Sequence, residues 1–379
     1  MVALKYGEHL ARTLPLVALG GACLLLLCDI CGRLLIYSVR STDWANSRSG
    51  GWHCVSVADF AGVTLMNRRF WILCGCIVGL AVFFMLYDSG FDVDYVLPKR
   101  LLRLGTILLA GVCIAVSSVV FQTLVTNRVL TPAVMGYESV YLFWQVLLLF
   151  FLGQSGLGLL GLNGNFFASM GLMLLYSWLI HHFLLPRARQ NLWLLLLFGL
   201  VLTMVITTLT QFIELKISPG EFSVFQGINY ASFNHSEIQT LIYAAVAMLV
   251  VGSLGYPYLS TLDVMALGEE QAVSLGVDYA RFVRWGFGLI AVLVAVSTSL
   301  VGPTAFMGVF IANMAYAFAG HFQHKRILWF ASAVAVAVFL VAQILVEHVF
   351  NYKTTVSILI NLICGVYFLL LIVRHRGMA

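Results

Sequence analysis

The sequence predicts an all-α membrane protein that crosses the bilayer many times. Hydrophobic residues make up 61% of its 379 residues and charged residues only 10%, whereas the surface of a soluble domain needs far more charge. Apolar runs of about 18 to 25 residues recur, and each is long enough to cross about 30 Å of hydrocarbon as a helix. A transmembrane β-barrel would instead alternate apolar and polar residues in runs of about ten. We therefore expect a polytopic helical protein.

About ten transmembrane helices are predicted within residues 66–379, and one further apolar segment precedes them. Each predicted helix is an apolar run separated from the next by charged or turn-forming residues. The predicted spans cover residues 70–87, 101–125, 138–153, 166–185, 191–211, 238–256, 284–301, 304–320, 327–346 and 356–373.

The basic residues between the spans predict the orientation of the chain. With Met66–Arg69 placed in the cytoplasm, eleven basic residues fall on the inside and four on the outside, as the positive-inside rule requires. The N- and C-termini of the unit 66–379 are then cytoplasmic, as is residue range 266–277. The inside set is Arg68, Arg69, Arg128, Arg187, Arg189, Arg281, Arg284, Lys325, Arg326, Arg374 and Arg376, and the outside set is Lys99, Arg100, Lys216 and Lys353.

Several classes of function are disfavoured by what the sequence lacks. The net charge of +5 comes from scattered residues, which does not predict a nucleic-acid partner. No G-x-x-x-x-G-K-S/T motif is present, so the chain is not expected to bind nucleotide phosphates itself. Its His, Cys and carboxylate residues do not have the spacing of a metal site. The spans are nearly free of ionisable residues, which argues against a membrane-embedded enzyme and against an ion-coupled carrier that works alone.

One apolar stretch is interrupted by Gly302 and Pro303. Proline removes a backbone donor, and an interrupted helix is tolerated in a membrane only where it faces protein or a water-filled path. The sequence leaves two alternatives, a tight turn between two spans or a broken helix beside a transport path.

A short polar segment, residues 266–277, lies between two long apolar spans. It is compatible with a helix, and a cytoplasmic loop has little need of such a pattern unless another protein docks there. The segment resembles the L-G-x-x-x-A-x-x-L-G coupling segment of the FecCD-like (vitamin B12-permease-like) ABC importer permeases. Matching residues are Leu267, Gly268, Ala272, Leu275 and Gly276, and Glu269 and Glu270 would lie on the face toward the ATPase. The alternative is that both glutamates are ordinary solvated charges.

Two further stretches resemble the same family. Residues Gln122, Asn127, Pro132 and Gly136 match its Q-x-x-x-x-N-P-L-A-x-P-x-x-x-G pattern, although Arg128 replaces the first proline. Residues from Gly302 and Pro303 to Gly308 resemble its G-x-(I/V)-x-F-(V/I)-G-L pattern. The resemblance implies that these residues line or interrupt the transport path.

Lys99 and Arg100 are expected just outside the second span, in a stretch that resembles the family's R-x-P-R motif without its first arginine. The resemblance implies contact with a binding protein or with an anionic substrate, because charge complementarity steers docking. The alternative is that both side chains extend along the bilayer interface.

The resemblance implies a permease subunit of an ABC importer in the bacterial cytoplasmic (inner) membrane. Its partners would be ABC ATPase subunits, a second permease subunit and an extracytoplasmic siderophore-binding protein. The cargo would be a ferric siderophore, with closest similarity to the anguibactin and catechol-siderophore permeases. ATP would be used by the partner ATPase, and no cofactor or metal is expected on this chain. Alternatives are a permease for another chelate, such as a corrinoid or haem, or a stand-alone ion-coupled carrier.

Residues 1–65 do not match this pattern. Tyr6–Tyr37 resembles the ninth span of another permease of the same family, but Ser38–Leu65 is too polar to continue it. Shifted by one base, the codons of Trp44 and Trp52 must each encode glycine, and the first glycine falls where the family has one. We hypothesise a frameshifted remnant of an upstream partner permease, with Met66 as the native start. The alternative is a genuine eleventh span with an unusual linker.

Overall fold

The structure is a computed structural model that describes residues 71–86, 96–128, 130–184, 192–233, 237–304, 306–319 and 323–376. These residues form helices and short connections, and none of them forms a strand. The chain divides into two compact units. One comprises Leu73–Ile344 and Thr354–Ala379, and the other comprises Met1–Ile72 and Leu345–Lys353. The predictions for residues 1–65 lie outside the described residues.

The larger unit contains most of the helices. A helix at Trp71–Leu86 precedes α4. The elements that follow are α4 (Val96–Val125), η1 (Pro132–Met135), α5 (Tyr137–Leu179), η2 (Ile180–Leu184), α6 (Leu192–Glu214), α7 (Pro219–Asn229), α8 (Ile238–Gly255), η3 (Tyr256–Tyr258), α9 (Leu259–Met265), α10 (Glu269–Ser274), α11 (Tyr279–Val301), α12 (Met307–Ala319), α13 (His324–Ile344) and α14 (Val356–Arg376). In the smaller unit, Leu345–Val349 forms the π-helical turn η4.

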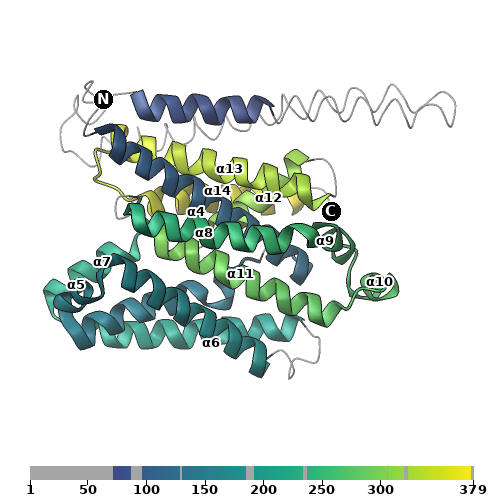
Figure 1. Cartoon of the computed structure of the whole chain (residues 1–379), viewed down its shortest axis with the longest axis horizontal. Helices are drawn as coiled ribbons and strands as arrows, with labels where there is room; N and C mark the ends of the chain where they lie inside the picture. Colours follow the sequence, from purple (N-terminus) through teal and green to yellow (C-terminus); the bar gives the residue numbers. More distant parts are fainter. Residues whose placement is uncertain are drawn as a thin grey trace. The chain divides into compact units, whose positions relative to one another are not determined.

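Helices α4 and α11 form the centre of the larger unit (Figure 1). They pack against each other, α4 also packs against α13, and α11 also packs against α5 and α8. Small residues lie at these contacts: a methyl group on Gly111 would be 3.3 Å from Val336, and one on Gly286 would be 2.5 Å from Leu124. Because lipid tails are as apolar as leucine, helices in a membrane associate mainly through such close packing.

Helix α5 is a helical hairpin. Its backbone leaves helical geometry at Gly153 (φ 62°, ψ −163°) and Gly161 (φ 63°, ψ 173°), conformations that only glycine adopts readily. The two arms are tied by Trp144 Nε1, which donates to Asn165 Oδ1 at 3.1 Å. The arms coincide with the separately predicted spans 138–153 and 166–185.

The all-α membrane fold is confirmed. Among the described residues, five helices are long and apolar enough to cross a membrane, namely Val96–Val125, Leu196–Glu214, Ile238–Met265, Tyr279–Val301 and His324–Val349. Helix α12 has 13 residues and is about 20 Å long, so it is shorter than the hydrocarbon layer. The number of crossings therefore stays a prediction. Helix α4 begins at Val96 and contains the whole of the predicted span 101–125.

Candidate functional site: the coupling segment and the helix break

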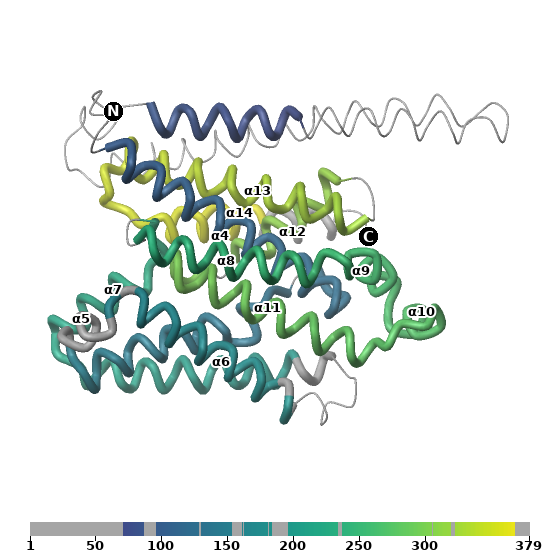
Figure 2. Tube along the Cα trace, viewed as in Figure 1, coloured from purple at the N-terminus to yellow at the C-terminus, as the bar shows by residue number. Residues whose placement is uncertain are grey.

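We call Ala266–Val277, for which the resemblance predicts contact with an ATPase, the coupling segment; it contains the short helix α10. Figure 2 shows α10 on the chain between α9 and α11, standing out at one end of the bundle. Gly268 precedes it with φ 101° and ψ 166°, and Gly276 follows its last turn with φ 85°. Residues that carry a Cβ atom rarely adopt these backbone angles, so both positions favour glycine. The amide of Val277 donates to the carbonyl of Ala272 at 3.0 Å and closes the segment.

The segment has one inward anchor and several exposed apolar side chains. Ala272 is fully buried in the main hydrophobic core of the unit. Leu267, Val273 and Leu275 are 58%, 55% and 63% exposed, and Glu270 is also exposed. Exposed apolar side chains on a projecting segment are typical of a docking surface.

Helix α11 links the coupling segment to the break at Gly302. It begins after Asp278, whose side chain accepts a hydrogen bond from the amide of Arg281 at 3.2 Å. It ends at Val301, where Gly302 takes φ 98° and ψ −175°. Its 23 residues span about 34 Å, so a single rigid element joins the two sites.

The turn at the break is held from two sides. The amide of Ser232 donates to the carbonyl of Val301 at 2.9 Å, and the amide of Thr304 donates to Glu138 Oε1 at 3.1 Å. Glu138 lies in the first turn of α5 and was not identified from the sequence. The available signal was an acidic residue at the start of an apolar span, where ionisable groups usually have a function.

The polar residues at the end of α4 shape the next turn. Gln122 Nε2 donates to the carbonyl of Arg128 at 2.8 Å, and the amide of Asn127 donates to the carbonyl of Gln122 at 3.2 Å. Asn313 on α12 also donates to the carbonyl of Arg128, at 3.2 Å. The segment that follows α4 is therefore fastened to both α4 and α12.

Two residues of this segment set its path. Pro132 begins η1, where its missing amide donor costs nothing. Gly136 has φ 89°, and a methyl group on it would lie 2.7 Å from both Thr203 Oγ1 and Tyr176 Oη. A side chain at residue 136 would therefore separate η1 from α5 and α6.

Gly308 allows α12 to approach α4. A methyl group on Gly308 would overlap the hydroxyl of Ser118 and lie 3.0 Å from Thr131 Cγ2. The structure thus brings Gln122, Asn127 and Gly308 into one region around α4 and α12, with Pro132 and Gly136 on the connected segment. Pro303 lies in the turn beyond the break.

Lys99 and Arg100 differ in environment. Arg100 is only 6% exposed, and its Nη1 donates to the carbonyls of Phe84 at 2.8 Å and Met85 at 3.2 Å. It therefore caps the end of the helix Trp71–Leu86. Lys99 is exposed one residue earlier in the same turn of α4.

Comparison with known proteins identifies the family. The sequence profile of the FecCD transport family matches residues 67–374. The chain belongs to the FecCD transport family. Among the relatives of this FecCD member, the petrobactin import system permease protein YclO of Bacillus subtilis is 35% identical over 304 residues, covering 79% of this chain and 96% of YclO. The petrobactin import system permease protein FatC of Bacillus anthracis is 29% identical over 320 residues, covering 82% of this chain and 90% of FatC.

A solved structure supports the same fold. A metal-chelate type ABC transporter in an inward-facing conformation matches this FecCD member with a TM-score of 0.72 and 22% sequence identity. The match covers 81% of this chain and 99% of the other. At this identity the likeness is evidence for the fold alone.

Proposed function

We propose that this chain is the permease subunit of an ABC importer that carries a ferric siderophore across the bacterial cytoplasmic membrane. The observation that carries the proposal is the projecting α10 segment with its exposed apolar side chains, on a chain of the FecCD family. The cargo is inferred from YclO and FatC, which are petrobactin import permeases. Membership of the family, the apolar helices and the absence of a nucleotide-binding motif all fit a transport subunit that depends on a separate ATPase.

The ATPase surface that receives α10 is expected to be an apolar groove with a basic edge. Leu267, Val273 and Leu275 supply the apolar contact, and Glu269 and Glu270 complement the basic edge. ATP-driven closure of the ATPase pair would displace α10. Because α11 is a continuous helix, that displacement would reach the turn at Gly302, where Glu138 and Ser232 hold the backbone.

The remaining partners follow from the same proposal. A second permease subunit would complete the path, and an extracytoplasmic binding protein would deliver the ferric siderophore. Lys99 is an exposed basic residue that would contact that protein, and Arg100, which is buried, contacts the end of the preceding helix. The charge distribution supports cytoplasmic ends for the unit 66–379.

The test is uptake of radioactive iron by cells that lack this gene and receive the full chain together with its ATPase and partner permease. Ferric petrobactin, other ferric siderophores, haem and a corrinoid are supplied one at a time. We expect ATP-dependent uptake of a ferric siderophore. Uptake of only haem or a corrinoid would overturn the siderophore assignment, and no uptake of any chelate by the assembled complex would overturn the importer proposal.

A matched pair of variants on α10 tests the docking surface. Val273→Asp places a charge among the exposed apolar side chains, and Ser274→Ala changes an exposed residue whose hydroxyl bonds only within α10, to the carbonyl of Glu270. We expect Val273→Asp to abolish both co-purification of the ATPase and uptake, and Ser274→Ala to preserve both. Retained co-purification in Val273→Asp would contradict the docking role of this segment.

A further inference from the structure

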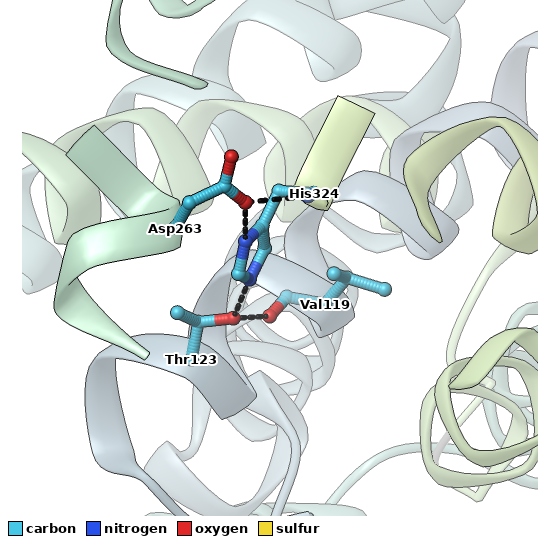
Figure 3. Close-up of polar contacts among 4 residues, drawn as sticks. All are labelled: Val119, Thr123, Asp263 and His324. Atoms are coloured by element: carbon cyan, nitrogen blue, oxygen red, sulfur yellow. Dashed lines mark hydrogen bonds and ion pairs between the residues drawn. The ribbon is translucent and has the colours of Figure 1, made fainter. Parts of the chain in front are cut away.

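Three polar side chains from three helices meet next to the coupling segment (Figure 3). Asp263 lies on α9, His324 is the first residue of α13, and Thr123 lies near the end of α4. Asp263 Oδ1 accepts from the backbone amide of His324 at 2.6 Å and lies 2.7 Å from its Nδ1. His324 Nε2 lies 2.8 Å from Thr123 Oγ1. We call these three residues the Asp–His–Thr bridge.

The bridge is continuous in two arrangements of its protons. Thr123 Oγ1 is also 2.9 Å from the carbonyl of Val119, forms a hydrogen bond with the side chain of Tyr316, and has one proton to donate. If that proton goes to Val119 or Tyr316, the bridge is continuous only when Nε2 and Nδ1 both donate, and His324 is then an imidazolium paired with Asp263. If the proton goes to Nε2, a neutral ring still donates from Nδ1 to Asp263. In both cases the imidazole joins α9 to α4.

The bridge runs from the surface into the interior. The Asp263 side chain is 37% exposed and that of His324 is 2% exposed. Thr123 is buried next to Gln122, the residue that fastens the segment after α4. The partly exposed end therefore lies on the helix that leads into α10, and the buried end lies at the start of the predicted transport path.

The rest of the contact around α9 is less directional. Leu262 and Met265 are buried in the main hydrophobic core, and the apolar contacts that they make there are non-directional. Lys325 donates to Tyr256 Oη at 3.1 Å, but this contact is exposed and is worth little in water. A buried hydrogen-bonded histidine resists displacement more strongly, because breaking it leaves polar groups without partners.

We propose that His324 is a positioning residue that transmits the movement of α10 to the inner end of α4, through Asp263 and Thr123. The proposal rests on the proposed ATP-driven import. It makes α4 a second route of transmission beside α11. Without the bridge, the ATPase still binds α10 and hydrolyses ATP, but α4 and the segment after it no longer follow the movement.

The variants separate the two ends of the bridge. His324→Asn keeps a donor near the position of Nδ1 and loses the contact with Thr123. His324→Gln keeps a donor near the position of Nε2 and loses the side-chain contact with Asp263. Thr123→Val removes the hydroxyl, and Thr123→Ser restores it.

The matched control is Thr106→Val. Thr106 is also buried on α4, and its hydroxyl donates to the carbonyl of Leu102 four residues earlier at 2.9 Å, as Thr123 does to Val119. It lies outside the bridge, so its loss reproduces the local helix change alone.

The measurement is chelate transported per ATP hydrolysed, in liposomes containing the full chain, its partner permease, the ATPase and the binding protein. We expect this ratio to fall about tenfold in Thr123→Val, His324→Asn and His324→Gln, the size of effect that a buried hydrogen bond to a charged group supports. Thr123→Ser and Thr106→Val should keep the wild-type ratio. If uptake and ATP hydrolysis fall in equal proportion, the bridge is only structural and the proposal is overturned.

A second readout does not depend on the cargo. Hydrogen exchange of backbone amides in residues 120–128 is followed in the complex with and without ATP. We expect ATP to change this exchange in the wild type and not in Thr123→Val. A wild-type complex that shows the change but moves no siderophore would support the bridge while the proposed cargo fails. A transporting wild type without the change would overturn the bridge.

Discussion

Gly308 is the position at which a single methyl group should be most informative. In Gly308→Ala the new carbon would overlap the hydroxyl of Ser118 and would lie 3.0 Å from Thr131 Cγ2 and 3.2 Å from Ser118 Cβ. Rotation of Ser118 can move its hydroxyl but cannot move its Cβ, so α4 and α12 must separate. Overpacking of this kind costs about 1–3 kcal/mol.

Double variants that combine Gly308→Ala with a smaller residue at position 118 show how much of the loss of stability comes from this one contact. Ser118→Ala removes the overlapping hydroxyl but leaves the 3.2 Å contact, and Ser118→Gly removes both. Thermal unfolding of the purified protein in detergent should therefore give the lowest Tm for Gly308→Ala, an intermediate value with Ser118→Ala added, and the highest value of the three with Ser118→Gly added. The last variant will not reach the wild type, because glycine inside a helix costs about 0.5–1 kcal/mol.

The reasoning would be refuted by either of two results. One is a Tm for Gly308→Ala within about 1 °C of the wild type, since a change of 1 kcal/mol shifts Tm by roughly 2–4 °C in domains of 150–250 residues. The other is a double variant with Ser118→Gly that is no more stable than Gly308→Ala. Either result would mean that α4 and α12 do not approach each other at this point.

Three other predictions concern substitutions at Gly268, at Glu138, and at the neighbouring residues Lys99 and Arg100. Gly268→Ala should destabilise the backbone before α10 by about 1–3 kcal/mol, because φ at residue 268 is 101°. The variant should also reduce co-purification of the ATPase, and unchanged co-purification would contradict this prediction. Glu138→Ala leaves the Thr304 amide without its acceptor, at a cost of about 1–3 kcal/mol, whereas Glu138→Gln keeps an acceptor oxygen. Tm should therefore fall in Glu138→Ala and not in Glu138→Gln. Equal Tm values for the two variants would count against the contact. Arg100→Met should lower Tm, because two carbonyls lose their donor. Lys99→Met should weaken binding of the extracytoplasmic protein, most strongly at low salt. The opposite pattern would reverse the roles of Lys99 and Arg100.

Most of the fold could be predicted from the sequence because hydropathy is a local property. The apolar runs coincide with helices, and Gly268 and Gly276 bound α10 as glycine does at helix ends. The contact made at the start of α4 could not be predicted, for a physical reason. Arg100 donates from its side chain to carbonyls of the preceding helix. No local pattern contains that partner.

The site could be predicted only in part. Motif resemblance predicts functional residues around α10, α4 and α12, because the motifs are short patterns along the chain, and their roles stay predictions. The contact of Glu138 with Thr304 joins residues 166 positions apart, and no pattern along the chain indicates it. The same limit applies to His324, which the sequence presents only as a histidine at the end of a span. Its neighbours become apparent when three helices are packed together.

The distance along the chain between Thr123 and His324 also constrains how the protein is made. The two residues are 201 positions apart, and a ribosome adds roughly 5–20 residues per second. Helix α4 is therefore synthesised roughly 10–40 s before α13 exists to meet it. During this interval the Thr123 hydroxyl lacks the His324 partner that it has in the finished protein, whereas the Val119 carbonyl of its own helix is already present. The bridge thus closes late in biosynthesis, after the coupling segment has emerged from the ribosome. A nascent chain that stops before α13 would present α10 without this attachment to α4.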